Sequence, residues 1–344
     1  MATSSEPRRK YWGGVSPYLG DKLPAIAQHY EAQGLYGVLA GQGWGPPWTA
    51  LAAAAAVTRR LQLGSAIAIA GVRSPFETAL VALDLDRISG GRFVLGLGTS
   101  TRWVTGSFFG TTDERPLARL RETVLAVRHV IRGAHRGLQP FRGTWFQADF
   151  AGAPPQPPPV REHIPIWLGA LGRHTTVLAG EIADGVIGHP LWGVDWWLGP
   201  VQDHLRQGLN RSGRTLSDVH RCPYLTVLIN ADRREAVHDA QRSIAGYAAF
   251  EQYNFFFDAR GFGDVARQVQ ALTRQGAPTA AADIVPEAMV QALAVVGDAD
   301  EVRRQVERLW QAADSIHLAP PVWGVPPERV AFYQKAIADA FYDG

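Results

Sequence analysis

The sequence predicts an α/β fold, a closed (β/α)8 barrel of eight parallel strands with insertion segments. Eight short apolar runs alternate with helical patterns along the chain, and this alternation is typical of parallel strands joined by helices. Eight such units are the number that closes a barrel, and 344 residues are enough for a barrel with insertions. An open, doubly wound sheet is the alternative architecture.

Each predicted strand is a short apolar run that ends in glycine or small polar residues. The predicted strands are residues 10–15, 35–40, 61–69, 92–97, 164–168, 185–187, 222–229 and 315–318.

Helical signals separate these runs. Apolar residues at helical spacing mark a helix from residue 23 to about Gly34, and an alanine-rich stretch indicates a second over 48–59. Pro75 suits the first turn of a third helix, which ends near Gly90. Apolar residues three and four apart over 117–131 predict a further amphipathic helix. Late in the chain, Asp298 followed by Glu301 is typical of a helix capping box.

Two segments break the rhythm, and both are interpreted as insertions into one domain that covers residues 1–344. The segment of about 133–163 contains five prolines in 154–159, which favour an irregular loop. The segment of about 233–296 has helical patterning and precedes the last strand.

The composition excludes several classes of protein. Lys and Arg total 34 against 32 for Asp and Glu, so the net charge of +2 gives no sign of a nucleic-acid-binding surface. The single cysteine, Cys222, rules out an internal disulfide and a cysteine-rich zinc site, and it suits a reducing compartment. No apolar run approaches the ~20 residues of a membrane span, and no secretory signal is recognisable. We therefore expect a cytoplasmic protein that binds neither nucleic acid nor membranes.

The residues just after each strand are the candidates for function, because a barrel builds its site from the loops at the carboxyl ends of its strands. After the second strand, residues 41–45 place Gln42 and Trp44 among three glycines, which let a ligand approach the backbone. After the fourth strand, Thr99, Ser100 and Thr101 offer hydroxyl groups. That segment is a weak dinucleotide motif, because Thr101 stands where its third glycine belongs.

The fifth strand leads into a candidate phosphate site. Gly169 to Thr176 passes from a strand into a helix, whose free backbone N–H groups attract an anion, and Arg173 and His174 add positive charge. An ordinary strand-to-helix turn is the alternative interpretation. No zinc-binding H-E-x-x-H, no G-x-S-x-G nucleophile motif and no Walker A loop is present, so metal, hydrolase and NTPase chemistry lack support.

Residues 85–98, LDRISGGRFVLGLG, resemble a signature of the bacterial luciferase-like monooxygenase superfamily. Further segments resemble the same family in the same order, over most of the chain: Gly64 with 73–75, 164–169, 179–187 and 296–298. The resemblance implies a TIM barrel that binds a flavin or the deazaflavin F420 at its carboxyl-terminal mouth. The sequence of residues 168–187 is most similar to that of the F420-dependent branch. Enzymes of that branch transfer a hydride between the cofactor and a small organic substrate.

The resemblance also implies roles for individual residues. The phosphate loop corresponds to Leu171, Gly172, His174 and Thr175, with His189 after the next strand. A bulge with a non-prolyl cis peptide bond behind the cofactor ring corresponds to Ala66 and Ile67, with Ile69 beyond it. Gly41, Thr99 and Ser100 complete the cofactor-binding set, and we assign the catalytic positions to Gln42, Trp44 and Thr101.

The sequence departs from the F420-dependent sugar-phosphate dehydrogenases of this family. Those enzymes carry Asp-His after the second strand and Glu after the fourth, whereas this chain has Gly41-Gln42 and Thr101. Those enzymes also carry a lysine after the sixth strand, and its position corresponds to one near Trp192 in this chain. Because Gln and Thr do not serve as general acid and base near neutral pH, these departures disfavour sugar-phosphate oxidation. They leave hydride transfer open, because the cofactor itself carries that chemistry.

Two other functions stay open, as does the nature of the substrate pocket. One is an FMN-dependent monooxygenase that takes reduced flavin from a separate reductase and activates oxygen; the other is a non-catalytic binding barrel. Aromatic residues over 253–257 and 192–197 either wall an apolar substrate pocket or pack against the outside of the barrel. The family resemblance also implies a homodimer.

Overall fold

A parallel barrel forms the centre of the computed structural model, which describes residues 9–43, 45–111 and 115–342. All eight predicted strands are present, which confirms the predicted fold class. The third and seventh are each split in two by a short interruption. The barrel strands are β1 (Tyr11–Gly14), β2 (Gly37–Ala40), β3 (Gln62–Ser65) with β4 (Ala68–Ile69), β5 (Phe93–Gly98), β8 (Ile166–Gly169), β9 (Gly185–Ile187), β10 (His220–Cys222) with β11 (Tyr224–Ile229), and β13 (Ile316–Ala319).

The barrel closes through the seventh strand. β10 pairs with β9 on one side, and β11 pairs with β13 on the other, with Pro223 alone between β10 and β11. The N–H of Gly188 donates to the carbonyl of Cys222 at 2.8 Å, and the N–H of His317 donates to the carbonyl of Pro223 at 2.9 Å. Because β13 also pairs with β1, the ladder returns to its first strand, which excludes the open doubly wound sheet.

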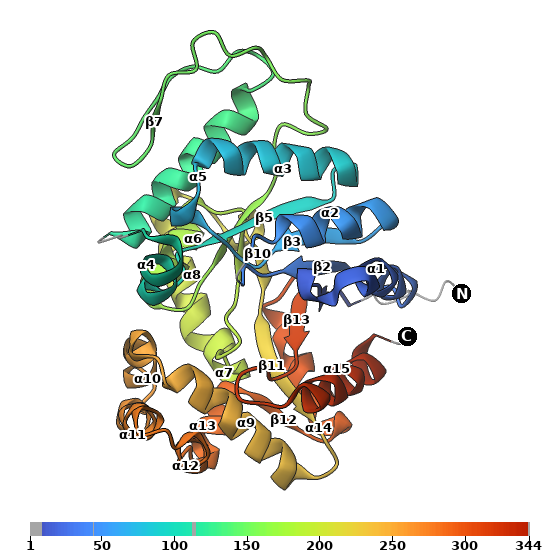
Figure 1. The fold of residues 1–344 in the computed structure, drawn as a ribbon, viewed down its shortest axis with the longest axis vertical. Coiled ribbons are helices and arrows are strands. Elements are labelled where there is room, and N and C mark those ends of the chain that lie inside the picture. Colours follow the sequence, from blue (N-terminus) through green and yellow to red (C-terminus); the bar gives the residue numbers. More distant parts are fainter. Residues whose placement is uncertain (1–8, 44, 112–114, 343–344) are drawn as a thin grey trace.

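Helices surround the barrel, as Figure 1 shows. Local signals set their ends: Ser74 Oγ accepts from the N–H of Phe76 at the start of α3, and Gly90, at φ 68°, ends that helix in the left-handed region. The capping box of Asp298 and Glu301 is formed at the start of α14. The surrounding helices are α1 (Leu23–Ala32), α2 (Trp48–Val57), α3 (Pro75–Ser89), α5 (Pro116–Gly133), α6 (Arg173–Ile182), α8 (Gln202–Ser212), α14 (Ala299–Glu307) and α15 (Pro327–Phe341).

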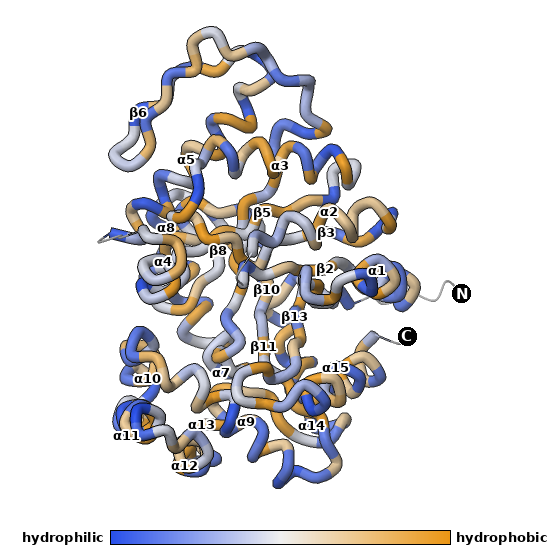
Figure 2. Tube along the Cα trace, in the orientation of Figure 1, coloured by the Kyte–Doolittle hydropathy of each residue, from blue (hydrophilic) through white to orange (hydrophobic). Residues whose placement is uncertain are grey.

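Apolar side chains fill two layers. One lies between the strands and the surrounding helices, and Figure 2 shows the apolar colouring concentrated on the inner elements. The other lies inside the barrel, where six strands each contribute one buried residue: Trp12, Leu39, Val94, Trp167, Ile187 and Cys222. Such a layer of inward side chains makes the lower part of the barrel a packed core with no channel through it.

The two predicted insertions differ in character. The proline-rich segment contains a small hairpin of β6 (Phe141–Arg142) and β7 (Gln147–Ala148), which was not expected, and it projects beyond α3 and α5 in Figure 1. The other segment is helical as predicted, and it adds β12 (Val295–Gly297), which pairs with β11. Its helices are α9 (Arg233–Ala248), α10 (Asn254–Asp258), α11 (Gly263–Arg274), α12 (Pro278–Asp283) and α13 (Glu287–Leu293). Within the described part of the chain, no helix combines the length and apolarity needed to cross a membrane.

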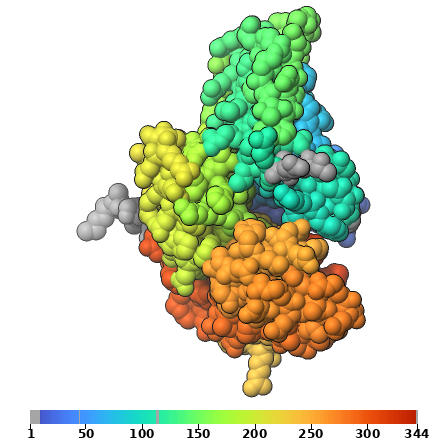
Figure 3. Space-filling model, turned by 90° about the vertical axis from the view of Figure 1, so that its left-hand side faces the viewer, coloured from blue at the N-terminus to red at the C-terminus, as the bar shows by residue number. Residues whose placement is uncertain are grey.

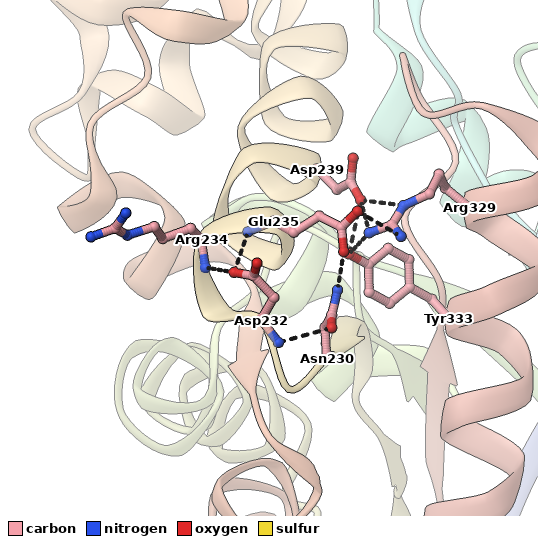
Figure 4. A network of polar contacts seen from close by, with 7 residues as sticks. All are labelled: Asn230, Asp232, Arg234, Glu235, Asp239, Arg329 and Tyr333. Carbon is pink, nitrogen blue, oxygen red and sulfur yellow. Dashed lines mark hydrogen bonds and ion pairs between the residues drawn. The ribbon is translucent and has the colours of Figure 1, made fainter.

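A buried polar network ties the helical insertion to the last helix of the barrel (Figure 4). Oδ2 of Asp239 on α9 accepts from Nε and Nη2 of Arg329 and from the hydroxyl of Tyr333, both on α15, at 2.6–2.9 Å. Glu235 pairs with Nη1 of the same arginine at 3.0 Å and accepts from Asn230, just after β11. Asp239 is 3% exposed and Tyr333 is fully buried, so this network lies in low dielectric.

Candidate active site

Four inward positions at the carboxyl-terminal end of the barrel are glycines. We call the space at that end the glycine hollow; Gly14, Gly41, Gly98 and Gly169 border it, at the ends of β1, β2, β5 and β8. Gly14 and Gly41 are solvent-exposed although both are inward positions on central barrel strands. Figure 3 shows this side of the molecule hollowed between the segments around α4 (Arg102–Phe109), α8 and α10. The packed layer below therefore forms the base of an accessible cavity.

Ile67 covers part of the hollow from the interruption between β3 and β4. A Cβ on Gly98 would lie 2.9 Å from Ile67 Cγ1, and one on Gly169 would lie 2.6 Å from Ile67 Cγ2. The peptide bond between Ala66 and Ile67 is cis, as expected from the family resemblance. Ser65 Oγ accepts from the N–H of Gly96 and donates to its carbonyl, both at 2.9 Å, which ties this segment to β5. The result is an apolar platform made of Ile67 and the glycines beside it.

Gln42 offers an unused hydrogen-bond donor at the edge of the hollow. Its Oε1 accepts from the N–H of Ile69 and from Nη1 of Arg73, each at 2.9 Å. With both donors on the oxygen, the orientation of the amide is assigned and the NH₂ group points elsewhere. Nε2 is buried without a partner, as is the indole nitrogen of Trp48, whose ring lies 5.7 Å from the Arg73 guanidinium. A buried amide without a partner typically costs about 1–3 kcal/mol, so this NH₂ group calls for an explanation.

The backbone just after β5, the fourth strand around the barrel, is unusual. Ser100 has φ 57°, the only left-handed value at a non-glycine position in the described ranges. Residues held in that region cluster at functional sites. Thr99 and Ser100 are half-buried, whereas Thr101 caps α4, its hydroxyl accepting from the N–H of Val104 at 3.3 Å. The structure therefore gives Thr101 a structural contact in addition to the catalytic role predicted for it.

The predicted phosphate loop starts α6. Gly172 is its N-cap, and α6 runs from Arg173 with Arg173 and His174 exposed and Thr175 half-buried. A Cβ on Gly172 would lie 2.8 Å from the ring of Phe255, so the helical insertion reaches this loop. The carbonyl of Leu171 accepts from the indole of Trp192 at 3.1 Å, which holds the loop against the residues after β9.

His189 follows β9, the strand that pairs with β8. Burial lowers the pKa of its ring to about 3, so it is neutral near pH 7. Its Nδ1 lies 3.3 Å from the N–H of Leu191, which can only donate. The proton of the neutral ring therefore sits on Nε2, which makes that atom a donor.

An array of aromatic rings crosses the mouth of the barrel. Trp103 of α4 lies 5.5 Å from Phe250, which lies 5.9 Å from Trp323 after β13. Trp323 lies 5.9 Å from Tyr247 of α9, and Tyr247 lies 5.6 Å from His189. Trp103 and Trp323 are each nearly half exposed. The array joins four separate segments of the chain and gives the mouth an apolar rim.

The two aromatic runs, residues 192–197 and 253–257, contain residues of both expected kinds. Some lie at the mouth and others serve for packing. Tyr253 lies 5.7 Å from His189 and Phe255 covers Gly172, so both belong to the mouth. Trp192 and Trp197 are buried and donate to the carbonyls of Leu171 and Ala312, which makes them packing residues. Phe256 and Phe257 are buried as well.

The structure brings most of the predicted residues to one end of the barrel. Gly41, Gln42, Ala66, Ile67, Ile69, Thr99, Ser100, Leu171, Gly172 and His189 all lie at carboxyl ends of strands; Trp44 lies outside the described residues. Sequence reasoning missed Arg73, Tyr224 and His317. The last two sit within apolar strands, and their inward direction depends on the register of the closed barrel.

Three buried histidines should make stability fall in mild acid. Burial lowers the pKa of His189 to about 3, and those of His220 and His317 to about 4, against about 6.5 in the unfolded chain. As the pH falls below about 6.5, these histidines become protonated in the unfolded chain but stay neutral in the folded protein, so the free energy of unfolding decreases. Between pH 7.5 and 5.5 we expect a loss of about 1 kcal/mol per histidine, or about 3 kcal/mol in all. Urea unfolding at both pH values measures it; unchanged or higher stability at pH 5.5 contradicts the prediction.

Comparison with known proteins identifies the family. The model of the luciferase-like monooxygenase family matches residues 14–315. A putative coenzyme F420-dependent oxidoreductase of Mycobacterium tuberculosis is 34% identical over 320 residues, which cover 88% of this chain and 90% of that protein. A 5,10-methylenetetrahydromethanopterin reductase of Archaeoglobus fulgidus is 27% identical over 293 residues, which cover 83% of this chain and 81% of the relative.

Solved structures share the fold. The coenzyme F420-dependent tetrahydromethanopterin reductase of Methanopyrus kandleri superposes with a TM-score of 0.77 at 22% identity, over 97% of this chain and all of that one. The fold and the glycine hollow define an α/β-barrel protein whose carboxyl-terminal mouth is lined by glycines and aromatic residues. The chain belongs to the luciferase-like monooxygenase family. Like its relatives in that family, it is an oxidoreductase.

Proposed function

We propose that this protein is an F420-dependent oxidoreductase that moves a hydride between the deazaflavin and a small organic substrate. The observation that carries the proposal is the unpartnered, buried NH₂ group of Gln42 beside a cavity bordered by glycines. A planar ring can approach the backbone only where side chains are missing. Gly14 leaves open space at the end of β1, and Gly98 and Gly169 let Ile67 pack flat beneath that space. The residues present therefore fit a flat cofactor. The names of the relatives support F420 as that cofactor.

The chain's own groups divide the binding tasks. Ile67 supports the ring, and the amide of Gln42 donates to an oxygen on its edge. The N-terminus of α6, with Arg173, His174 and the neutral Nε2 donor of His189, holds the phosphate. When bound, the cofactor supplies the carbon that gives or takes the hydride. The aromatic rim excludes water from the substrate side.

The same rim supports an apolar substrate over a sugar phosphate. Trp103, Phe250 and Trp323 offer ring faces and edges and no charge. We expect turnover with apolar alcohols, enones or imines and none with sugar phosphates. We further propose a homodimer, and a flavin reductase as partner only if the cofactor is FMN.

Parallel fluorescence titrations with F420 and FMN test the cofactor, and two Gln42 variants test the site. Gln42→Glu keeps an acceptor for Ile69 and Arg73 but loses the NH₂ donor, whereas Gln42→Leu loses both. We expect micromolar or tighter F420 binding to the wild type and a 10- to 100-fold loss in both variants, the cost of one buried hydrogen bond. Tighter binding of FMN would redirect the function to oxygenation, and binding of neither cofactor would contradict the proposal. Full affinity in Gln42→Glu would show that Nε2 does not contact the cofactor.

A further inference from the structure

The sequence places almost no carboxylate close to the glycine hollow that could act as a general acid or base. The four residues after each barrel strand include one acidic residue, Asp232, after β11. Its side chain is occupied as the N-cap of α9, where it accepts from the N–H groups of Arg234 and Glu235. A hydride transfer that makes or breaks an O–H bond also moves a proton, so another group has to hold that proton.

His317, on β13, has the geometry for this task. Its Nδ1 lies 2.9 Å from the carbonyl of Trp12, and a carbonyl only accepts, so Nδ1 carries the hydrogen. Burial lowers the pKa of the ring to about 4 and keeps it neutral near pH 7, which leaves a lone pair on Nε2. Nε2 has no hydrogen-bond partner among residues 9–43, 45–111 and 115–342.

The ring of His317 borders the hollow directly. Its Cε1, the atom bonded to both ring nitrogens, is 4.0 Å from where a Cβ on Gly14 would stand. The ring of Tyr224 lies 4.5 Å away, edge to face, on the strand that pairs with β13. If His317 served only for packing, Asn, Gln or Ala could stand in its place. None of these would present a basic atom to the cavity.

The titratable groups around His317 are uncharged near neutral pH. Burial raises the pKa of the Tyr224 hydroxyl to about 12 and that of the Cys222 thiol to about 12. Tyr247 adjoins Tyr224, and burial raises its pKa as well. Among these groups, His317 is therefore the one that carries a free basic lone pair near neutral pH.

We propose that Nε2 of His317 accepts and returns the proton that accompanies hydride transfer in the glycine hollow, with Tyr224 fixing the orientation of the ring. This inference rests on the proposed function. In the oxidation of an alcohol, the C–H bond breaks and its electron pair leaves with the hydride to the oxidised cofactor. The O–H bond breaks, its proton moves to Nε2, and the C=O double bond forms. Reduction of a carbonyl runs through the same transfers in reverse.

NMR of the full-length protein with ¹³C,¹⁵N-labelled histidine tests the placement without a substrate. The variant His317→Asn assigns the resonances, and its side-chain NH₂ keeps a donor toward the Trp12 carbonyl while removing Nε2. We expect His317 to be the neutral Nδ1–H tautomer at pH 7.5 and its Nε2 and Cε1 resonances to shift when F420 is added. The exposed His163, in the loop before β8, serves as the control that does not shift.

Kinetics complete the test, with the substrate that a screen of alcohols, enones and imines identifies. We expect His317→Asn to bind F420 within threefold of the wild type and to lose 10²- to 10⁴-fold in kcat, together with one limb of the pH–rate profile. The inference would be overturned by the opposite tautomer, by resonances that do not shift when F420 binds, or by an unchanged kcat in the variant. In each of these cases, F420 binding would leave the proposed function standing. If the wild type binds neither F420 nor FMN, the proposed function and this inference fail together.

Discussion

Gly14→Leu is expected to abolish cofactor binding while the protein stays folded. Gly14 is an inward position at the end of β1, and the nearest atom to a Cβ there is His317 Cε1 at 4.0 Å. Its backbone has no left-handed φ, so an L side chain fits without strain. A leucine would fill the glycine hollow, and we expect at least a 100-fold loss of F420 affinity, about 2.7 kcal/mol. Fluorescence titration measures the loss.

Gly14→Ala is the matched control for this prediction. A single methyl group meets ordinary van der Waals contact at that position, so affinity should fall by less than about fivefold. The urea midpoint of both variants should stay close to that of the wild type. Full affinity in Gly14→Leu would place the cofactor outside the hollow and contradict the proposed site.

Asp239→Ala is expected to cause the largest loss of stability. The substitution leaves the Arg329 guanidinium and the Tyr333 hydroxyl without their shared buried partner. Breaking one side of a buried ion pair typically costs about 3–5 kcal/mol. We expect the lower end of that range, because Arg329 keeps Glu235 as a partner while the buried Tyr333 hydroxyl loses its acceptor. Since the network joins α9 to α15, unfolding should begin with the separation of the helical insertion from the barrel. Urea unfolding followed by tryptophan fluorescence and circular dichroism measures the loss.

Asp339→Ala, on α15, the helix that carries Arg329 and Tyr333, provides the comparison. Asp339 pairs with Lys335 at 2.6 Å, but both side chains are more than half exposed. Exposed pairs contribute about 0–1 kcal/mol, so this variant should unfold close to the wild type. Equal losses in the two variants would show that the buried network contributes no more than a surface pair.

Local patterns were enough to predict the eight barrel strands of this protein and several of its helices. Apolar runs mark the barrel strands, and the helix start at Pro75, the helix end at Gly90 and the cap at Asp298 lie where the sequence places them. These signals are local because a strand or a helix end is set by residues within a few positions of one another. The hairpin of β6 and β7 escaped prediction because two-residue strands in a proline-rich loop leave no periodic pattern.

The site could be predicted only as a set of strand ends. The sequence indicated which residues follow each strand, and the family resemblance indicated the cis bond between Ala66 and Ile67. Which side chains are free to act was decided by contacts between distant segments. Gln42 has a spare donor because Ile69 and Arg73 occupy its oxygen, while the Thr101 hydroxyl accepts a bond from its own helix.

By itself, then, the sequence determined the fold class, the order of the barrel elements and the end of the barrel where the candidate site residues lie. The tertiary structure alone decided that Ile67 packs against Gly98 and Gly169, and that His317 lies beside Gly14 with a free nitrogen. The reason is physical: a strand's alternation tells two faces apart, but which face turns inward depends on register and barrel closure. Trp12 and His317 are about three hundred residues apart in sequence, and only the pairing of β1 with β13 brings them together.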